Sequence, residues 1–341
     1  MSDENKGAFH EITRSEIYIN LTITACILII GVILIAFGYN EAFFTSNNIL
    51  YAIFNIITNF GDENLYIVFF CLFYFGIDKK FAKRLIIGFL ISLHITDFLK
   101  NLFQDPRPLS NMGVDGPKAD GYGFPSGHTS GSMSFYGYTY FSFLEEEKKR
   151  RIPIQIFAIF LMITVPLSRL IIGVHDLQDV VGGFIIGFLV ITAYMYFEPK
   201  ISEIFEKWSL NKKIWMGLAF SVGLWALSSM ILYLLNSNLV DLKQSIQDLG
   251  VSCGILMGAA ISFPIEEKYV KYDPNKLKLL YKILATLIAL VITFGVYFGL
   301  SFLFNLAPSI YYITRALKYC IFIIISALGI PYLLNLIFKQ K

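Results

Sequence analysis

The chain has 341 residues, of which 56% are hydrophobic and 16% carry a charge. Soluble globular domains carry about a quarter charged residues, so the composition excludes an ordinary soluble domain and indicates an integral membrane protein. A net charge of +3 is too small to suggest a nucleic-acid partner. We expect an all-α fold, because the apolar runs have the length of membrane-spanning helices.

Long apolar runs set the expected architecture. A helix needs about 20 apolar residues to cross the hydrocarbon core of a bilayer. Runs near that length lie at 17–38, 84–101, 152–172, 179–197, 213–235, 278–305 and 316–338, and shorter ones at 65–77, 128–144 and 246–264. Together they predict about ten transmembrane helices, of which the run at 65–77 is the weakest.

Basic residues gather on one side of these expected spans. Both termini share that side with Lys79–Arg84, Lys148–Arg151, Lys200–Lys213 and Lys268–Lys282. The positive-inside rule places this side in the cytoplasm. We therefore expect a multi-pass protein of the cell (plasma or inner) membrane with both termini cytoplasmic. The segments Pro106–His128 and Arg169–His175 would then face the extracytoplasmic side.

A polar segment divides the expected spans into two groups. We predict a six-span core at 1–198 with a signature region at 100–179, a cytoplasmic linker at 199–213, and a four-span C-terminal membrane extension at 214–341. Between the first two spans, apolar residues from Ile49 to Phe60 recur at helical spacing. A helix in the outer membrane interface and an ordinary packed connector explain that spacing equally well.

Three polar clusters interrupt the apolar pattern of the expected core. They are Lys100–Pro108, Gly121–His128 and Ser168–Asp179. Ionisable groups beside a membrane core are expensive, so such clusters indicate a functional site. These clusters are suited to binding a phosphate, because they contain cations, histidines, a serine and a glycine at a helix start. In a helix, His175 and Asp179 would share one face, so that the carboxylate can fix the imidazole tautomer.

Taken one at a time, these residues have ordinary structural explanations. Lys100 and Arg107 could anchor helix ends at the interface, Arg169 could extend its charge to the headgroups, and His128 could cap a helix. The clusters favour a functional site only when they are taken together.

Taken together, the clusters resemble a known family signature. Lys-x6-Arg-Pro (Lys100 to Pro108), Pro-Ser-Gly-His (Pro125 to His128) and Ser-Arg-x5-His-x3-Asp (Ser168 to Asp179) are similar to the three motifs of the type 2 phosphatidic acid phosphatase (lipid phosphate phosphatase) superfamily. Order, spacing and residue type match at every signature position. The resemblance covers roughly residues 50–197.

The resemblance implies a phosphoric monoester or diphosphate hydrolase. Because the sequence shows no set of metal ligands and its cations can supply the charge that a metal would, we predict metal-independent activity. The hydrolase's partner would be a membrane lipid phosphate or a polyprenyl pyrophosphate, such as undecaprenyl pyrophosphate, and no cofactor is expected. It implies His175 as the nucleophile that becomes a phosphohistidine, Asp179 as the group that orients it, and His128 as general acid and base. The implied phosphate-binding residues are Lys100, Arg107, Ser126, Gly127 and Arg169.

Other functions stay open at this point. The same phosphohistidine could pass its phosphoryl group to another acceptor, which would make the protein a lipid phosphoryl transferase. An anionic-substrate transporter is a more distant alternative, because transporter sites lie near the bilayer midplane and these ionisable residues lie at span ends. The sequence does not distinguish phosphatidate, phosphatidylglycerol phosphate, undecaprenyl pyrophosphate and a sphingoid phosphate. It also leaves open the oligomeric state and the role of the four C-terminal spans.

Overall fold

The computed structural model describes residues 12–40, 45, 47–108, 121–143, 148–235, 239–305 and 311–339, and these form helices joined by turns. The predicted all-α membrane architecture is confirmed. The chain divides into two compact units. The first unit comprises residues 1–66 and 91–201, and the second comprises residues 67–90 and 202–341.

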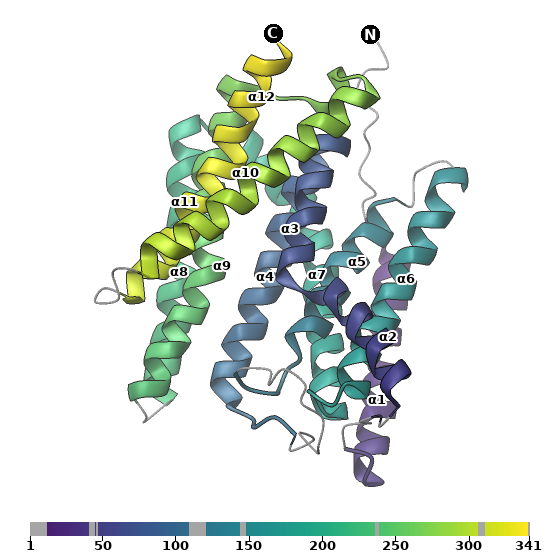
Figure 1. Ribbon diagram of the computed structural model, residues 1–341. Coiled ribbons are helices and arrows are strands. Elements are labelled where there is room, and N and C mark those ends of the chain that lie inside the picture. The colour runs from purple at the N-terminus through teal and green to yellow at the C-terminus, as the bar shows by residue number, and fades with distance from the viewer. Residues whose placement is uncertain are drawn as a thin grey trace. The chain divides into compact units, whose positions relative to one another are not determined.

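The first unit contains the helices that carry the three motifs. Its elements are α1 (Arg14–Ala36), α2 (Asn48–Thr58), the 3-10 turn η1 (Asn59–Gly61), α5 (Gly127–Ser142), α6 (Lys148–Ile171), the C-terminal part of α4 (Lys79–Phe103) and most of α7 (Leu177–Glu206). Both α2 and α5 pack against α6, and Figure 1 shows α2 lying across it.

Close backbone contact brings the start of α5 beside the start of α7. A Cβ atom on Gly183 would lie 2.6 Å from the carbonyl oxygen of Ser126, and one on Gly187 would collide with the carbonyl oxygen of Ser130. Small residues four apart let two membrane helices approach at backbone distance. The second and third motifs therefore meet because α7 presents glycine to α5.

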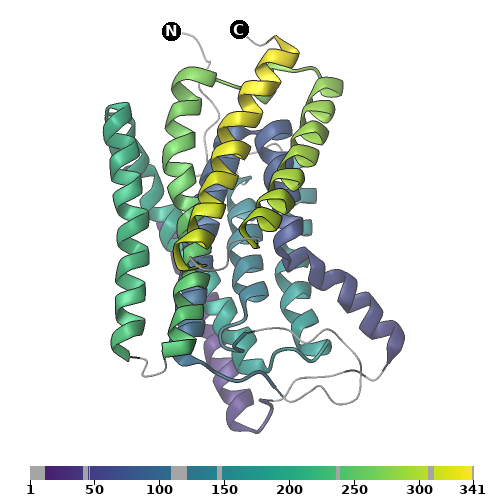
Figure 2. The ribbon, with the colours of Figure 1, turned by 60° about the vertical axis from the view of Figure 1, so that its left-hand side comes forward.

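The second unit contains the C-terminal helices together with the corner between α3 and α4. Its elements are most of α3 (Glu63–Cys71), the π-helical turn η2 (Leu72–Ile77), α8 (Leu210–Leu235), α9 (Leu239–Ile265), η3 (Glu266–Val270), η4 (Pro274–Lys276), α10 (Leu279–Asn305), α11 (Tyr311–Ile324), η6 (Ile325–Gly329) and α12 (Ile330–Phe338). α9 packs against both α8 and α11, as Figure 2 shows for the green and yellow helices.

Eight helices of the described residues are long and apolar enough to cross a membrane. The pair Asn48–Gly61 and Glu63–Ile77, bent by 54°, adds a ninth if it is counted as one span. The predicted total of about ten also depends on α5, whose 16 residues fall short by length. Most of α5 is buried, so protein rather than lipid surrounds most of it.

A contact in the second unit supports α5 as a crossing helix. Lys79, at the start of α4, pairs with Glu266, just after α9, at 2.8 Å. These two residues lie on one side of the membrane, so the chain between them crosses it an even number of times. Five candidate spans lie between them, α4, α6, α7, α8 and α9, so the count is even when α5 also crosses.

The expected domain boundaries stay a prediction, and the structure adds detail to them. α7 continues through the first half of the expected linker to Glu206, and α8 begins at Leu210. The corner at residues 67–90 clusters with the C-terminal helices, where the Tyr74 hydroxyl donates to the Ala327 carbonyl at 3.2 Å. The amphipathic helix expected from Ile49 is confirmed as α2, while its place in the membrane interface and the sidedness of the protein stay predictions.

Candidate active site

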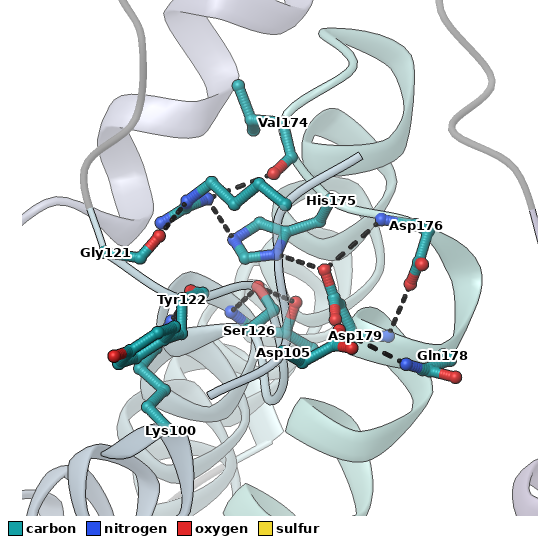
Figure 3. A network of polar contacts seen from close by, with 12 residues as sticks. Lys100, Asp105, Gly121, Tyr122, Ser126, Val174, His175, Asp176, Gln178 and Asp179 are labelled. Carbon is teal, nitrogen blue, oxygen red and sulfur yellow. Dashed lines mark hydrogen bonds and ion pairs between the residues drawn. The ribbon is translucent and has the colours of Figure 1, made fainter. Parts of the chain in front are cut away.

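His175 and Asp179 form the centre of the candidate site. The Nδ1 atom of His175 lies 2.8 Å from Oδ2 of Asp179, and both side chains are buried (Figure 3). Asp179 lies in the first turn of α7, whereas His175 lies in the turn just before this helix rather than within it. Because the carboxylate accepts the proton on Nδ1, the imidazole nitrogen that remains available is Nε2.

The end of α6 explains why Arg169 and His175 stand six positions apart. Gly173 has a φ of +79°, the left-handed conformation that ends many helices. The chain then turns back, and the backbone N–H groups of Val174 and His175 both point to the carbonyl oxygen of Arg169, at 3.2 and 3.3 Å. The turn thus satisfies the helix end and delivers His175 to the start of α7.

Arg107 lies on the other side of the imidazole ring. Its Nη1 is 3.0 Å from Nε2 of His175 and also donates to the carbonyl oxygen of Val174, at 3.0 Å. Its Nε donates to the carbonyl oxygen of Gly121 at 3.0 Å. A guanidinium can only donate, so Nε2 accepts and His175 is neutral with its proton on Nδ1. An interfacial anchor does not explain these bonds.

The surroundings of His175 favour its neutral form. Burial lowers the pKa of His175 well below its usual value, and the positive charges of Arg107, Arg169 and Lys100 lower it further. His128 lies within electrostatic range and acts in the same direction. A neutral nitrogen keeps its lone pair, which a nucleophile requires.

Lys100, Ser126 and Gly127 lie around the start of α5. Lys100 Nζ donates to the carbonyl oxygen of Tyr122 at 2.8 Å, and its Cε lies 3.7 Å from where a Cβ on Gly127 would be. The backbone N–H of Ser126 donates to the carbonyl oxygen of Asp179 at 2.9 Å. The N–H groups of a first helical turn have no partner within the helix, and together with the positive dipole end they attract an anion.

Arg169 points into the protein, so the explanation in which it extends to the headgroups is wrong. The residue is 6% exposed, and its Nη1 donates to Oγ1 of Thr58 at 2.7 Å. Among the described residues, its buried Nε has no hydrogen-bond partner. A buried donor without a hydrogen-bond partner destabilises the fold unless a ligand accepts its hydrogen bond.

Several polar neighbours of the site were not predicted. Gln178 Nε2 donates to Oδ2 of Asp105 at 3.3 Å, and the backbone N–H of Asp179 donates to Oδ1 of Asp176 at 3.0 Å (Figure 3). Burial raises the pKa of Asp176. Asp105, Asp176 and Gln178 stand between motif positions, which is the signal that could have found them. Thr58 lies far before the first motif, and its sequence context carries no such signal.

The eight predicted site residues all belong to the first unit, and their roles stay predictions. Bonds join Arg107 to His175, His175 to Asp179, and Asp179 to Ser126. In the part of the chain that the structure describes, no group of three or more His, Cys, Asp and Glu is arranged to hold a metal ion. Metal independence likewise stays a prediction.

Two family models match the chain. The model described as PAP2 superfamily matches residues 81–203, and the model described as PAP2 superfamily phosphatase, transmembrane extension, matches residues 250–340. The first match contains all three motifs. The second covers most of the expected C-terminal extension.

Curated relatives are lipid phosphate phosphatases. Human sphingosine-1-phosphate phosphatase 2 is 28% identical over 45% of this chain and 39% of its own length. Mouse sphingosine-1-phosphate phosphatase 1 is 24% identical over 64% and 50%, and lipid phosphate phosphatase delta of Arabidopsis thaliana is 21% identical over 51% and 44%. The chain thus spans about half the length of the curated relatives it matches, or less.

One solved structure is also similar. It is the transmembrane PAP2 type phosphatidylglycerolphosphate phosphatase from Bacillus subtilis, with 21% identity and a TM-score of 0.39. The match covers 55% of this chain and 89% of that one.

Proposed function

The chain belongs to the PAP2 superfamily, and on that premise we propose that it is a membrane phosphatase that hydrolyses a lipid phosphate through a phosphohistidine intermediate. The observation that carries the proposal is the buried pair of His175 and Asp179, with Arg107 at the opposite ring nitrogen. One nitrogen is oriented by a carboxylate, and the other faces a group that binds phosphate.

The first step forms the phosphoenzyme. A phosphoryl oxygen replaces Nε2 as the partner of the Arg107 guanidinium, which frees the nitrogen to attack. Nε2 of His175 bonds to phosphorus while the bond from phosphorus to the lipid oxygen breaks. His128 gives its proton to that leaving oxygen. Asp179 stabilises the positive charge that develops on the imidazole.

The second step releases phosphate. His128, now neutral, takes a proton from water, and the oxygen of that water bonds to phosphorus. The bond between phosphorus and Nε2 breaks, so His175 returns to its neutral state. Lys100, Arg107, Ser126, Gly127 and Arg169 would hold the phosphoryl oxygens in both steps and offset their charge. The positive charges of Lys100, Arg107 and Arg169 would perform the electrostatic task that a metal performs in other phosphatases, so we propose that turnover needs no metal.

The proposed substrate is a phosphate monoester on a lipid. The curated relatives are named for sphingosine 1-phosphate and lipid phosphate. These names favour a lipid monophosphate over a polyprenyl pyrophosphate as the substrate. We also propose that the site faces the extracytoplasmic side and that both termini are cytoplasmic, because the basic loops favour that orientation.

Phosphate release by purified protein in detergent tests the proposal. The panel contains sphingosine 1-phosphate, phosphatidate, phosphatidylglycerol phosphate and undecaprenyl pyrophosphate, each in buffer with excess EDTA and without an added acceptor. We expect release from at least one lipid monophosphate. No release from any of them would contradict the proposal, and release that requires an acceptor would indicate a transferase.

The intermediate is tested separately with substrate labelled on phosphorus. We expect acid-labile label on the wild-type protein and none on the His175→Ala variant, whose turnover should fall by about 10⁴-fold or more. Label that persists on the His175→Ala variant would rule out His175 as the nucleophile. Loss of turnover in EDTA that returns with a divalent cation would overturn metal independence alone.

A further inference from the structure

The bend between α2 and α3 packs against two motif-bearing helices although it lies outside all three motifs. This bend comprises residues 58–62. The hydroxyl of Tyr136, on α5, donates to the carbonyl oxygen of Phe60 at 2.7 Å. The Phe60 ring meets the edge of Phe157, on α6, with ring centroids 6.3 Å apart. The bend is therefore held to both α5 and α6.

Thr58, at one end of the bend, holds Arg169. Both side chains are buried, at 7% and 6% exposure, and Oγ1 of Thr58 accepts from Nη1 of Arg169 at 2.7 Å. A guanidinium is a rigid plane of five N–H donors, so holding Nη1 also sets the directions of the other donors. The buried Nε donor of Arg169, which no described residue satisfies, then has a defined direction. A phosphoryl oxygen is the acceptor that such a donor suits.

Gly61, near the other end of the bend, makes room for His128. A Cβ atom on residue 61 would lie 2.9 Å from Cδ2 of His128 and 2.8 Å from Cγ1 of Val165. Both distances are shorter than real contacts of a Cβ atom. Any side chain at this position would therefore move the imidazole or the valine.

We infer that Thr58 and Gly61 are positioning residues of the reaction: Thr58 directs Arg169 to the phosphoryl oxygens, and Gly61 sets the place of His128. The inference rests on the proposed phosphatase function. It assigns separate effects to the two residues, because Arg169 would bind phosphate and His128 would transfer protons.

The Thr58→Val variant tests the first role, because it removes the hydroxyl and keeps nearly the same shape. We expect KM and the inhibition constant of vanadate to rise by about 10-fold, since the lost bond involves a charged group. The Thr58→Ser variant keeps the hydroxyl, so its KM and its vanadate inhibition constant should stay within about two-fold of the wild-type values. Thr164→Val is the matched control, because the Thr164 hydroxyl donates to the Phe160 carbonyl of its own helix.

The Gly61→Ala variant tests the second role. We expect kcat to fall by about 10-fold or more, in the range of lost general acid–base catalysis, with the vanadate constant unchanged. Adding Val165→Ala removes the collision with valine and leaves the collision with His128. Activity should therefore stay low in the double variant. Its recovery would show that the glycine serves packing alone and would overturn the second role.

The outcomes separate this inference from the function on which it rests. A wild-type protein that releases no phosphate contradicts the proposed function. An active wild type with unchanged KM and vanadate constant in folded Thr58→Val overturns the role of Thr58. Thermal unfolding in detergent checks that each variant is folded. If Thr58→Val does not fold, Thr58→Ser and the Gly61 variants decide. Weaker vanadate binding in Thr58→Ser would contradict the role of Thr58, and an unchanged kcat in Gly61→Ala would contradict the role of Gly61.

Discussion

Each of the two units buries a cluster of charged residues, and the two clusters differ in how completely they are paired. In the second unit, Oε1 of Glu266 pairs with Lys79 at 2.8 Å and accepts from the backbone N–H of Tyr272 at 3.0 Å. Oε2 pairs with Lys83 at 3.0 Å. Both carboxylate oxygens therefore have partners, and the cluster ties the start of α4 to the turn after α9.

The cluster in the first unit is incomplete. Three cations, Lys100, Arg107 and Arg169, surround the site, and their charges reach His175. Among the described residues, Nε of Arg169 and Oδ1 of Asp179 are buried without a hydrogen-bond partner. A buried polar group without a partner destabilises a fold, so it is kept where a ligand or a reaction uses it. The difference is what we expect of a structural clamp in one unit and of the proposed phosphate-binding site in the other.

Among the substitutions that test this comparison, the largest expected effect comes from Asp179, the carboxylate that we propose orients the nucleophile. The Asp179→Asn variant should lose about 10³- to 10⁴-fold in kcat, because an amide holds the imidazole in the wrong tautomer and cannot support its positive charge. Phosphate release under single-turnover conditions measures this loss.

Asp176→Asn is the matched control for that variant. Asp176 accepts from the N–H of Asp179 at the start of α7, and asparagine caps a helix as well as aspartate does. We expect kcat within a few-fold of wild type. An equal loss in both variants would mean that the acidic cluster acts only as a structural unit.

The second effect tests the clamp. Glu266→Gln removes the carboxylate that pairs with Lys79 and leaves Lys83 only the exposed Glu267, 3.9 Å away. The free energy of unfolding should therefore fall by about 3 kcal/mol, a typical value for breaking a buried pair. Chemical denaturation in detergent measures it, and kcat per folded molecule should stay unchanged. Glu203→Gln is the control, because the pair of Glu203 with Lys207 is exposed and should contribute nothing measurable. A large fall in kcat per folded molecule would contradict the structural assignment of Glu266.

The smallest effect concerns the protonation of His175. Burial and then Arg107 lower its pKa below the unfolded value of about 6.5. As pH falls through 6.5, His175 becomes protonated in the unfolded chain but stays neutral in the folded protein. This histidine therefore lowers the free energy of unfolding below that pH and has no such effect above it. NMR of protein labelled with ¹⁵N-histidine, assigned with His175→Ala, should show a neutral ring at pH 6.

Removal of the neighbouring cation should move this titration. In Arg107→Gln we expect the pKa of His175 to rise, because one nearby positive charge is lost. A pKa that stays in place would mean that burial alone sets it. A wild-type ring already protonated at pH 6 would contradict the neutral nucleophile.

Most of the helices can be predicted from the sequence, because in lipid a run of about 20 apolar residues satisfies its backbone hydrogen bonds within the segment only as a helix. The expected runs at 17–38 and 84–101 correspond to α1 and α4. The run at 128–144 corresponds to α5, which is short and rich in glycine and serine. Its neighbours are protein, so its composition follows helix packing rather than membrane thickness.

The sequence alone determined which residues could do the chemistry, because His175, Asp179 and the cations stand at fixed spacings along three short motifs. Only the tertiary structure decided which ring nitrogen of His175 is available, how Arg107 reaches it, and that Thr58 lies against Arg169 and Gly61 against His128. The reason is physical. Periodicity and spacing describe contacts within one helix or turn, whereas a bond between α6 and the bend at 58–62 depends on how separate helices pack.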